Sequence, residues 1–255
     1  MKSIAVITGA SSGLGRAYAH ALVTKVEEIW AIARHEDALQ ALRAELGERI
    51  VPLPMDLTIR ANLDVLRERL EREHPRIHYA IADAGFAKFC TYSDLSLGES
   101  LNMIDLNCGA SVAAALLCLP YMDRGDYLLF VASQAAFQPL PCQNLYSATK
   151  AFVRHYARAL NLELAPRGIT ATAVCPGWMR THLYDRAIIG ARKGTRRFPG
   201  MVSPEAVAKQ SLRDAQRGRD MSVYGLRVKA EHMAAKLLPQ RAMMRLFLAQ
   251  QGIRL

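Results

Sequence analysis

The chain has 255 residues, of which 51% are hydrophobic, and it carries a formal net charge of +10. This composition excludes a disordered chain, and the length allows one large α/β domain or two smaller ones. No apolar run reaches the roughly 20 residues that a membrane span requires. A strand-like stretch already begins at Ser3 and leaves no room for a signal or transit peptide, so we expect a cytoplasmic protein.

Apolar, β-branched runs alternate with stretches of helical period along the first two-thirds of the chain. The predicted strands are Ile4–Thr8, Ile29–Ala33, Ile50–Pro54, Tyr79–Ala82, Tyr127–Ala132 and Ile169–Val174. The predicted helices are Leu14–Lys25, Glu36–Leu46, Ala61–Glu73, Leu101–Tyr121 and Leu145–Ala165. This alternation predicts an α/β fold, a doubly wound parallel sheet with helices on both faces. No linker or repeat divides the chain, so residues 1–255 are predicted to form a single domain.

A glycine-rich turn joins the first predicted strand to the first helix. It contains Gly9, Ser11, Ser12, Gly13, Leu14 and Gly15, in the spacing Gly-x3-Gly-x-Gly. Glycines allow the backbone to turn sharply and to approach a pyrophosphate closely, and the following helix directs free N–H groups at the anion. The turn therefore predicts a dinucleotide site.

The ends of the second and third strands indicate which dinucleotide binds. Arg34 follows the second strand, and the first acidic residue after it is Glu36, in the next helix. An arginine at this point accommodates a 2′-phosphate, whereas an acid accepts from a free 2′-hydroxyl, so Arg34 favours NADP(H). Asp56, after the third strand, is placed either to accept from the adenine amino group or to cap the helix that follows Ile59.

Tyr146 and Lys150 stand four residues apart, with Ser133 thirteen residues before Tyr146. Residues i and i+4 share one face of a helix, so the ammonium is predicted to lie beside the phenol. A neighbouring cation favours the phenolate and lowers the pKa of the tyrosine from its usual value of about 10. This arrangement predicts acid–base catalysis by Tyr146.

Together these residues resemble the short-chain dehydrogenase/reductase family, from Ser3 to about Thr181. Further matches are Leu57 at the adenine contact, Asn107, and the segment from Pro176 to Thr181 with Gly177 and Met179. The resemblance implies a single Rossmann-type domain that transfers hydride between NADP(H) and a carbonyl or secondary alcohol. It further implies that Tyr146 donates the proton, Ser133 holds the substrate oxygen and Lys150 binds the nicotinamide ribose. Asn107 would support a water relay to Lys150, and residues 176–181 would hold the nicotinamide end.

Two neighbouring positions depart from the family pattern, with a methyl group at Ala82 and a carboxylate at Asp83 in place of two amides. The family usually has Asn-Asn-Ala-Gly after the fourth strand, and this chain has Ala82, Asp83, Ala84 and Gly85. At Asp83 a carboxylate that only accepts replaces an amide that donates and accepts, which puts the local cofactor and strand contacts in question. The five cysteines form no CxxC pair, so we expect reduced thiols and no metal site.

The entire net charge of +10 comes from residues 181–255, which hold 15 Lys and Arg against 5 Asp and Glu, whereas residues 1–180 hold 18 of each sign. Residues 182–202 form a predicted substrate lid with five basic residues, Arg186, Arg192, Lys193, Arg196 and Arg197. These either bind an acidic handle on the substrate, such as a phosphopantetheine thioester, or form a solvated loop. Residues 229–255 form a basic, Met-containing tail, helical and broken at Pro239. The tail is predicted to contact a second subunit or to lie peripherally on an anionic membrane.

The leading hypothesis is therefore an NADP(H)-dependent carbonyl reductase or alcohol dehydrogenase, for a 3-oxoacyl thioester, a steroid or polyol, or another carbonyl. The alternative is a catalytically idle dinucleotide-binding regulator that uses its basic C-terminal segment to bind a partner or an anionic surface. Residues 203–255 contain only Tyr224 and Phe247 as aromatics, which disfavours nucleic-acid binding. We expect a homodimer or homotetramer, paired through the helices Leu101–Tyr121 and Leu145–Ala165.

Overall fold

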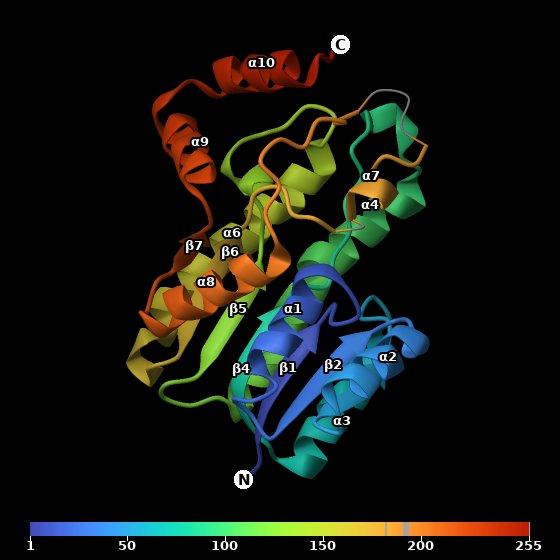
Figure 1. Ribbon diagram of the computed structural model, residues 1–255, viewed down its shortest axis with the longest axis vertical. Coiled ribbons are helices and arrows are strands. Elements are labelled where there is room, and N and C mark those ends of the chain that lie inside the picture. Colours follow the sequence, from blue (N-terminus) through green and yellow to red (C-terminus); the bar gives the residue numbers. More distant parts are fainter. Residues whose placement is uncertain (182, 191–193, 255) are drawn as a thin grey trace.

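A computed structural model describes every residue except 182, 191–193 and 255. Within the described residues, one parallel sheet of seven strands forms the centre of the molecule, in the order β3-β2-β1-β4-β5-β6-β7 (Figure 1). The strands are β1 (Ser3–Thr8), β2 (Glu28–Ala33), β3 (Ile50–Pro54), β4 (Arg76–Ala82), β5 (Tyr127–Val131), β6 (Thr170–Cys175) and β7 (Met221–Val223). The predicted parallel α/β sheet is confirmed. Its strand order reverses between β1 and β4, the place where ligands bind in such sheets.

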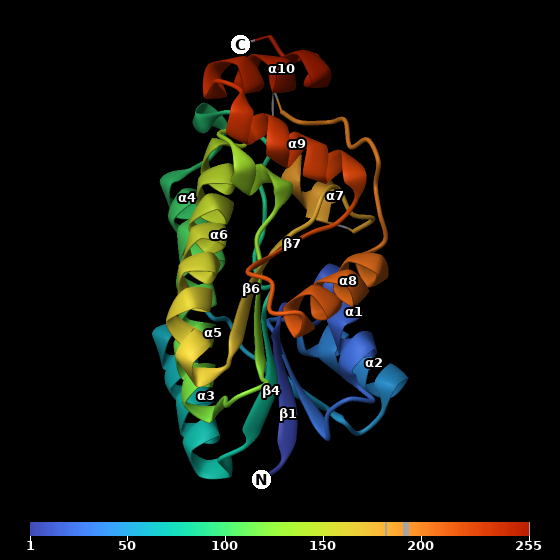
Figure 2. The ribbon, with the colours of Figure 1, turned by 90° about the vertical axis from the view of Figure 1, so that its left-hand side faces the viewer.

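Helices cover both faces of the sheet (Figure 2). One layer contains α3 (Arg60–Glu73), α4 (Leu97–Ile104), α5 (Ala110–Cys118) and α6 (Asn144–Leu164), and the other contains α1 (Gly13–Leu22), α2 (Glu36–Leu46) and α8 (Pro204–Gln216). Strand side chains point alternately to the two faces, so Ile4 and Val6 enter one core while Ala5 and Ile7 enter the other. The helices α7 (Leu183–Ala187), α9 (Leu226–Leu237) and α10 (Gln240–Gln251) lie beyond the carboxyl ends of the strands.

The prediction of two strands was incomplete because polar residues interrupt their apolar pattern in the sequence. β4 begins three residues earlier than predicted, with Arg76 and His78 inside it. Both side chains contact the buried Asp126, at 3.2 Å from Arg76 Nη2 and 2.6 Å from His78 Nδ1 to Asp126 Oδ1. β7 was not predicted: it is three residues long, and the hydroxyl of its central Ser222 donates to Asp214 of α8 at 2.7 Å.

The predicted helix Leu101–Tyr121 belongs to a longer helical segment, Leu97–Tyr121. Its length and mean hydropathy would suffice to cross a membrane, which corrects the expectation that no run is long enough. Asp105 interrupts the apolar residues of this segment, so no uninterrupted apolar run is long enough. The mean hydropathy of the segment is nevertheless high. Half of the apolar window is buried inside the protein, where α5 packs on β4 and α4 packs on α6. Packing on the sheet accounts for this apolar face.

The outer surface of this layer supports the predicted pairing of subunits. Exposed apolar side chains lie on three of its helices, with Leu101 on α4, Leu116 on α5, and Phe152 and Leu162 on α6. These helices lie side by side in the layer (Figure 2). Exposed apolar side chains gathered on one face are typical of an interface between subunits.

We expect light scattering to show a dimer or tetramer at micromolar concentration. Leu116→Glu should shift the protein toward the monomer, because a charge buried in an apolar interface loses its hydration. Val65→Glu is the matched control, since Val65 on α3 is 55% exposed and Leu116 is 58% exposed. A monomeric wild-type protein would show that the prediction is wrong.

Candidate active site

A cavity of about 1140 Å³ opens at the carboxyl edge of the sheet. The loops that follow β1, β4, β5 and β6 converge on it. It is lined by most of the residues predicted from the sequence: Gly9, Ser11, Ser12, Gly13, Leu14, Arg34, Leu57, Asp83, Ser133, Tyr146, Lys150, Pro176, Gly177, Met179 and Thr181. Three predicted residues do not line the cavity but contact the turns and loops that form it: Gly15, Asp56 and Asn107. The tertiary structure thus brings residues from the whole length of the chain into one site.

The glycine-rich turn forms a cradle that side chains would fill. Gly9 adopts a φ of +73°, and a Cβ there would lie 3.0 Å from the amide nitrogen of Ala84. A Cβ on Gly15 would lie 2.3 Å from the carbonyl oxygen of Gly9. Ser12 precedes α1 without forming a side-chain cap, so the N–H groups of Gly13 and Leu14 at the start of the helix are left for an anion, while that of Gly15 donates to Asp83. These features fit the pyrophosphate of a dinucleotide.

Asp83 keeps the acceptor role at the position where the family usually has an amide. Its carboxylate accepts a hydrogen bond from the N–H of Gly15. Its own N–H and that of Ala84 donate to the Thr8 hydroxyl at 3.0 Å each. Burial raises the pKa of Asp83, and the nearby Lys150 ammonium opposes that rise. The strand contacts questioned from the sequence are therefore intact.

Arg34 lies exposed at the end of β2 and lines the cavity beside His35. Burial acts to raise the pKa of Asp56, but the two hydrogen bonds from Thr58 and, to a smaller extent, the Arg34 charge hold that pKa below its usual range. Asp56 Oδ1 accepts from the backbone N–H of Thr58 at 2.9 Å and from its hydroxyl at 2.7 Å. The carboxylate thus organises the turn before α3, and contact with adenine stays a prediction.

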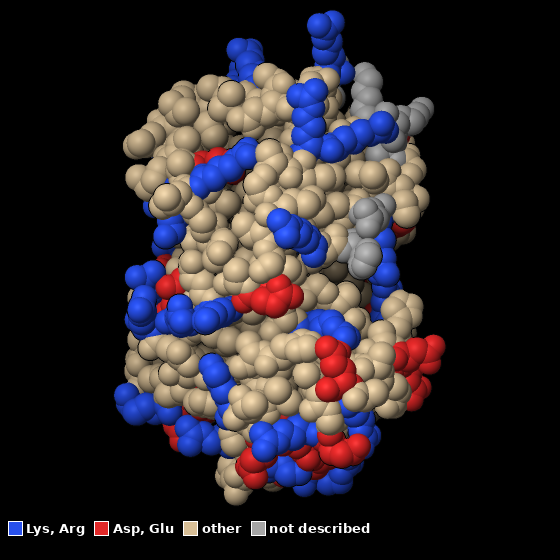
Figure 3. Space-filling model, in the orientation of Figure 1, with Lys and Arg blue, Asp and Glu red and all other residues tan. Residues whose placement is uncertain are grey.

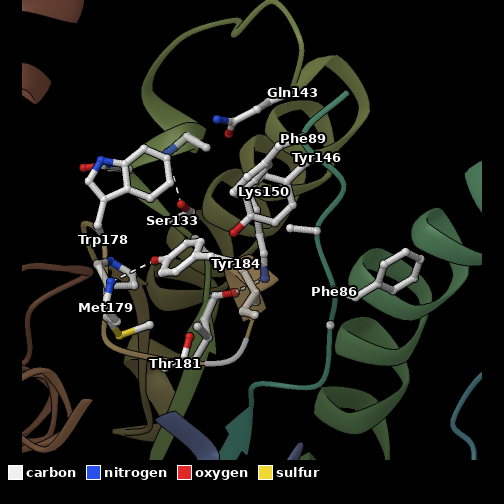
Figure 4. Close-up of a pocket in the computed structure, with 18 of the residues that line it drawn as sticks. Phe86, Phe89, Ser133, Gln143, Tyr146, Lys150, Trp178, Met179, Thr181 and Tyr184 are labelled. Atoms are coloured by element: carbon white, nitrogen blue, oxygen red, sulfur yellow. Dashed lines mark hydrogen bonds between the residues drawn. The ribbon is translucent and has the colours of Figure 1, made fainter. Parts of the chain in front are cut away.

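The reacting groups of the predicted catalytic set meet at the centre of the cavity (Figure 4). Ser133 follows β5, and its hydroxyl accepts from the N–H of Ala135 at 3.1 Å and hydrogen bonds the Tyr146 phenol. Lys150, one turn after Tyr146 on α6, has its Nζ 5.9 Å from the centre of the tyrosine ring. The expected proximity of the two side chains is present.

The expected lowering of the Tyr146 pKa is wrong for this arrangement. Burial raises the pKa of Tyr146 to about 12, the Ser133 hydrogen bond lowers it, and the Asp83 charge raises it further. Lys150 instead directs its Nζ to the carbonyl oxygen of Val131 at 2.7 Å, and burial lowers its own pKa. The phenol therefore stays protonated at neutral pH.

Asn107 is completely buried on a π-helical turn, Asp105–Gly109, between α4 and α5. Its Oδ1 accepts from the N–H of Phe86 at 3.0 Å, while its Nδ2 donates to the Phe86 carbonyl and to the Thr149 hydroxyl at 3.0 Å each. A Cβ on Gly85 would lie 2.8 Å from Asn107 Oδ1 and 3.5 Å from Lys150 Nζ. Asn107 thus fixes the loop after β4 against the lysine, and π-turns often occur at such functional positions.

An aromatic cluster surrounds the tyrosine, and sequence reasoning missed it. The ring of Phe89 packs edge-on against Tyr146 at 5.7 Å, and Tyr184 stacks on Phe198 at 4.7 Å. Trp178 contacts both Phe89 and Tyr184. Phe89 follows β4, whereas Trp178, Tyr184 and Phe198 follow β6, the last two within the predicted lid. No spacing in the sequence relates Phe89 to the others. These residues make the space beside the reacting groups flat-walled and apolar.

The C-terminal tail packs over this cavity, which neither sequence hypothesis foresaw. Met243 and Phe247 of α10 are buried, and Phe247 joins the aromatic cluster. The side chain of Gln251 fixes the helix to the lid, because its Oε1 accepts from the N–H of Arg197 at 3.0 Å and its Nε2 donates to the Arg197 carbonyl at 3.0 Å. The tail therefore forms a wall of the site.

The basic residues of the lid are only partly described. Arg192 and Lys193 lie outside the described residues, while Arg186 and Arg197 line the cavity. Figure 3 shows Lys and Arg around the α9–α10 end with few acidic side chains, whereas both signs mingle at the opposite end. The uneven charge of the sequence thus corresponds to one end of the molecule.

Comparison with known proteins agrees with this geometry. The sequence profile of the family described as short chain dehydrogenase matches residues 3–188. An uncharacterized oxidoreductase of Staphylococcus aureus is 28% identical over 229 residues, which cover 89% of this chain and 96% of that protein. The family resemblance inferred from the sequence is confirmed.

Solved structures share the whole fold. A short-chain dehydrogenase from Sphingobium yanoikuyae in complex with NADPH is 29% identical, with a TM-score of 0.79 over 100% of this chain and 97% of that one. A short chain dehydrogenase/reductase from Burkholderia phymatum in complex with NAD has a TM-score of 0.78 over 92% of this chain and 95% of that one. It is 19% identical and shows the fold alone.

Proposed function

Because the chain belongs to the short-chain dehydrogenase family, we propose that it is an NADP(H)-dependent oxidoreductase that interconverts a carbonyl and a secondary alcohol. The observation that carries the proposal is the meeting of Ser133, Tyr146 and Lys150 in one cavity with the glycine cradle. An idle dinucleotide-binding regulator would have no need for a buried, protonated phenol beside a hydroxyl and a lysine. The small-molecule partner is thus a carbonyl or alcohol compound.

The residues divide the work of the reaction. Bound NADP(H) supplies or accepts the hydride. Tyr146 donates a proton to the carbonyl oxygen in the reducing direction, and Ser133 holds that oxygen with a hydrogen bond as negative charge develops on it. Lys150, held by the Val131 carbonyl, provides positive charge behind the phenol. Asn107 fixes the loop that carries Phe86 and so keeps the lysine side of the cavity in place.

Arg34 supports NADP(H) over NAD(H). It lines the cavity at the end of β2, and the nearest acids after it, Glu36 and Asp37, lie in the first turn of α2. A guanidinium suits the 2′-phosphate, and the NADPH complex of the Sphingobium yanoikuyae relative agrees with this choice.

A direct test is NADPH and NADH oxidation against a panel of ketones and aldehydes, run together with NADP⁺ reduction by secondary alcohols. Turnover in either direction supports the proposal. Tight NADPH binding without turnover of any carbonyl or alcohol would favour the regulator instead.

We expect NADPH to bind more tightly than NADH, and Arg34→Asp to reverse that preference. Hydrogen bonds to charged groups contribute about 1.5–3 kcal/mol, which is roughly a 10- to 100-fold change in Kd. Solvent exposure of Arg34 places the expected effect near the lower figure. Calorimetric titration of both cofactors measures it. Arg60→Asp makes the same charge change at an exposed arginine outside the cavity and should keep the preference. Equal affinities in the wild-type protein would contradict the assignment.

A further inference from the structure

The wall of the cavity contains a buried amide with one unsatisfied polar atom. Gln143 is 1% exposed and lines the cavity. Its Nε2 donates to the Thr195 hydroxyl at 2.7 Å, while its Oε1 is buried and has no hydrogen-bond partner among the described residues. If the amide is turned over, the Thr195 hydroxyl donates to the oxygen and the NH₂ group is left instead. In either orientation one strong polar atom lacks a partner, which is costly in an apolar setting.

This amide lies beside the reacting groups. Gln143 immediately precedes α6 and lies three residues before Tyr146 in the chain, and its backbone angles, φ −143° and ψ 27°, are not helical. Figure 4 shows Gln143 above Tyr146, with its amide on the side of the cavity where Trp178 and Ser133 lie. Cys142 just before it adopts a φ of +61°, a conformation that residues other than glycine rarely adopt. The backbone turn into α6 thus fixes where the amide is held.

A second unsatisfied amide oxygen lies in the same cavity. Gln138, in the loop between Ser133 and α6, also lines the cavity, and its buried Oε1 has no partner within the part of the chain that the structure describes. Phe89, Trp178 and Tyr184 form an aromatic wall of the same cavity. Polar atoms of this kind in an otherwise apolar pocket fix the orientation of a ligand.

We propose that Gln143 recognises a hydroxyl group on the substrate, one or two carbons from the reacting carbonyl, so that the preferred substrate is a hydroxy ketone with a flat apolar body. A hydroxyl both donates and accepts, so it satisfies the amide in either orientation. The flat body packs against the aromatic wall, and Gln138 serves as a second acceptor. The ketone gains a hydride and a proton at the carbonyl while the hydroxyl is unchanged, so the product is the corresponding diol. This inference rests on the proposed function and names its substrate class.

The test compares matched ketones that differ only in the hydroxyl: 2-hydroxyacetophenone with acetophenone, and 2-hydroxycyclohexanone with cyclohexanone. A single neutral hydrogen bond predicts a kcat/KM ratio of at least about fivefold in favour of each hydroxy ketone. Gln143→Leu should bring the ratio to about one, and Gln143→Met provides a second variant should Leu disturb folding. Thr195→Val removes the present partner of the amide but keeps the amide, so it should retain the ratio.

Binding provides a readout separate from turnover. Quenching of tryptophan fluorescence by 2-hydroxyacetophenone measures its Kd for the cofactor-free wild-type and Gln143→Leu proteins. The Kd should be at least about fivefold lower for the wild-type protein. A wild-type enzyme that reduces both members of each pair equally would overturn this inference and leave the proposed function standing, with an ordered water as the partner of the amide. An enzyme that reduces no carbonyl and oxidises no alcohol would overturn both.

Discussion

Tyr146→Phe should lower kcat at least about a hundredfold, the lower range for a positioned general acid, while the Kd for NADPH stays nearly unchanged. Phenylalanine keeps the edge-on contact with Phe89 but has no proton to give. Steady-state kinetics in the reducing direction and a cofactor titration measure the two effects. Tyr18→Phe is the matched control, because Tyr18 is also buried and its hydroxyl forms a hydrogen bond with Ser211, away from the cavity. A Tyr146→Phe enzyme with more than about a tenth of the wild-type rate would show that another group donates the proton.

The pH dependence of carbonyl reduction and of alcohol oxidation also tests the assignment of Tyr146 as the acid and base. Because burial raises the pKa of Tyr146 to about 12, the phenol stays protonated across the neutral range and its protonation should not limit carbonyl reduction there. Alcohol oxidation requires the phenolate, so its rate should rise with pH toward that value. A profile of oxidation that stays flat from pH 7 to pH 10 would contradict a phenolate base with this pKa.

Lys150→Met should weaken both catalysis and cofactor binding. We expect at least about a hundredfold loss of kcat/KM and roughly a tenfold rise in the Kd for NADPH, because one buried ammonium serves both the phenol and the bound cofactor. Methionine is of similar length and fills the space, but it leaves Asp83 without its nearby positive charge, so the pKa of Asp83 should rise further.

The control for the lost positive charge is Lys209→Met, an exposed lysine on α8 outside the cavity. Kinetics and calorimetric titration of the two variants separate the roles. A Lys150→Met protein with unchanged NADPH affinity and a low kcat would assign the lysine to the phenol alone. An unchanged kcat with weak binding would assign it to the cofactor alone.

Features that depend on neighbouring residues were predicted from the sequence. The apolar runs of β1, β2 and β3 form strands within one residue of their predicted bounds, because a buried parallel strand must be apolar on both faces. The turn from Gly9 to Gly15 and the helical pair Tyr146 and Lys150 were recognised for the same reason: turn geometry and the period of a helix are local.

What only the tertiary structure decided depends on contacts between distant residues. The pKa of Tyr146 rises because the site is buried and the Asp83 charge lies near it, and the ammonium of Lys150 donates to the Val131 carbonyl. The spacing of these residues in the sequence indicates neither contact. β7 is too short to be recognised without β6 beside it. Phe247 reaches the aromatic wall from the far end of the chain. The periodicity of the sequence determines which face of a helix or strand is apolar. The burial of a side chain, its electrostatic surroundings and its hydrogen-bond partner depend on which residues the fold brings next to that side chain.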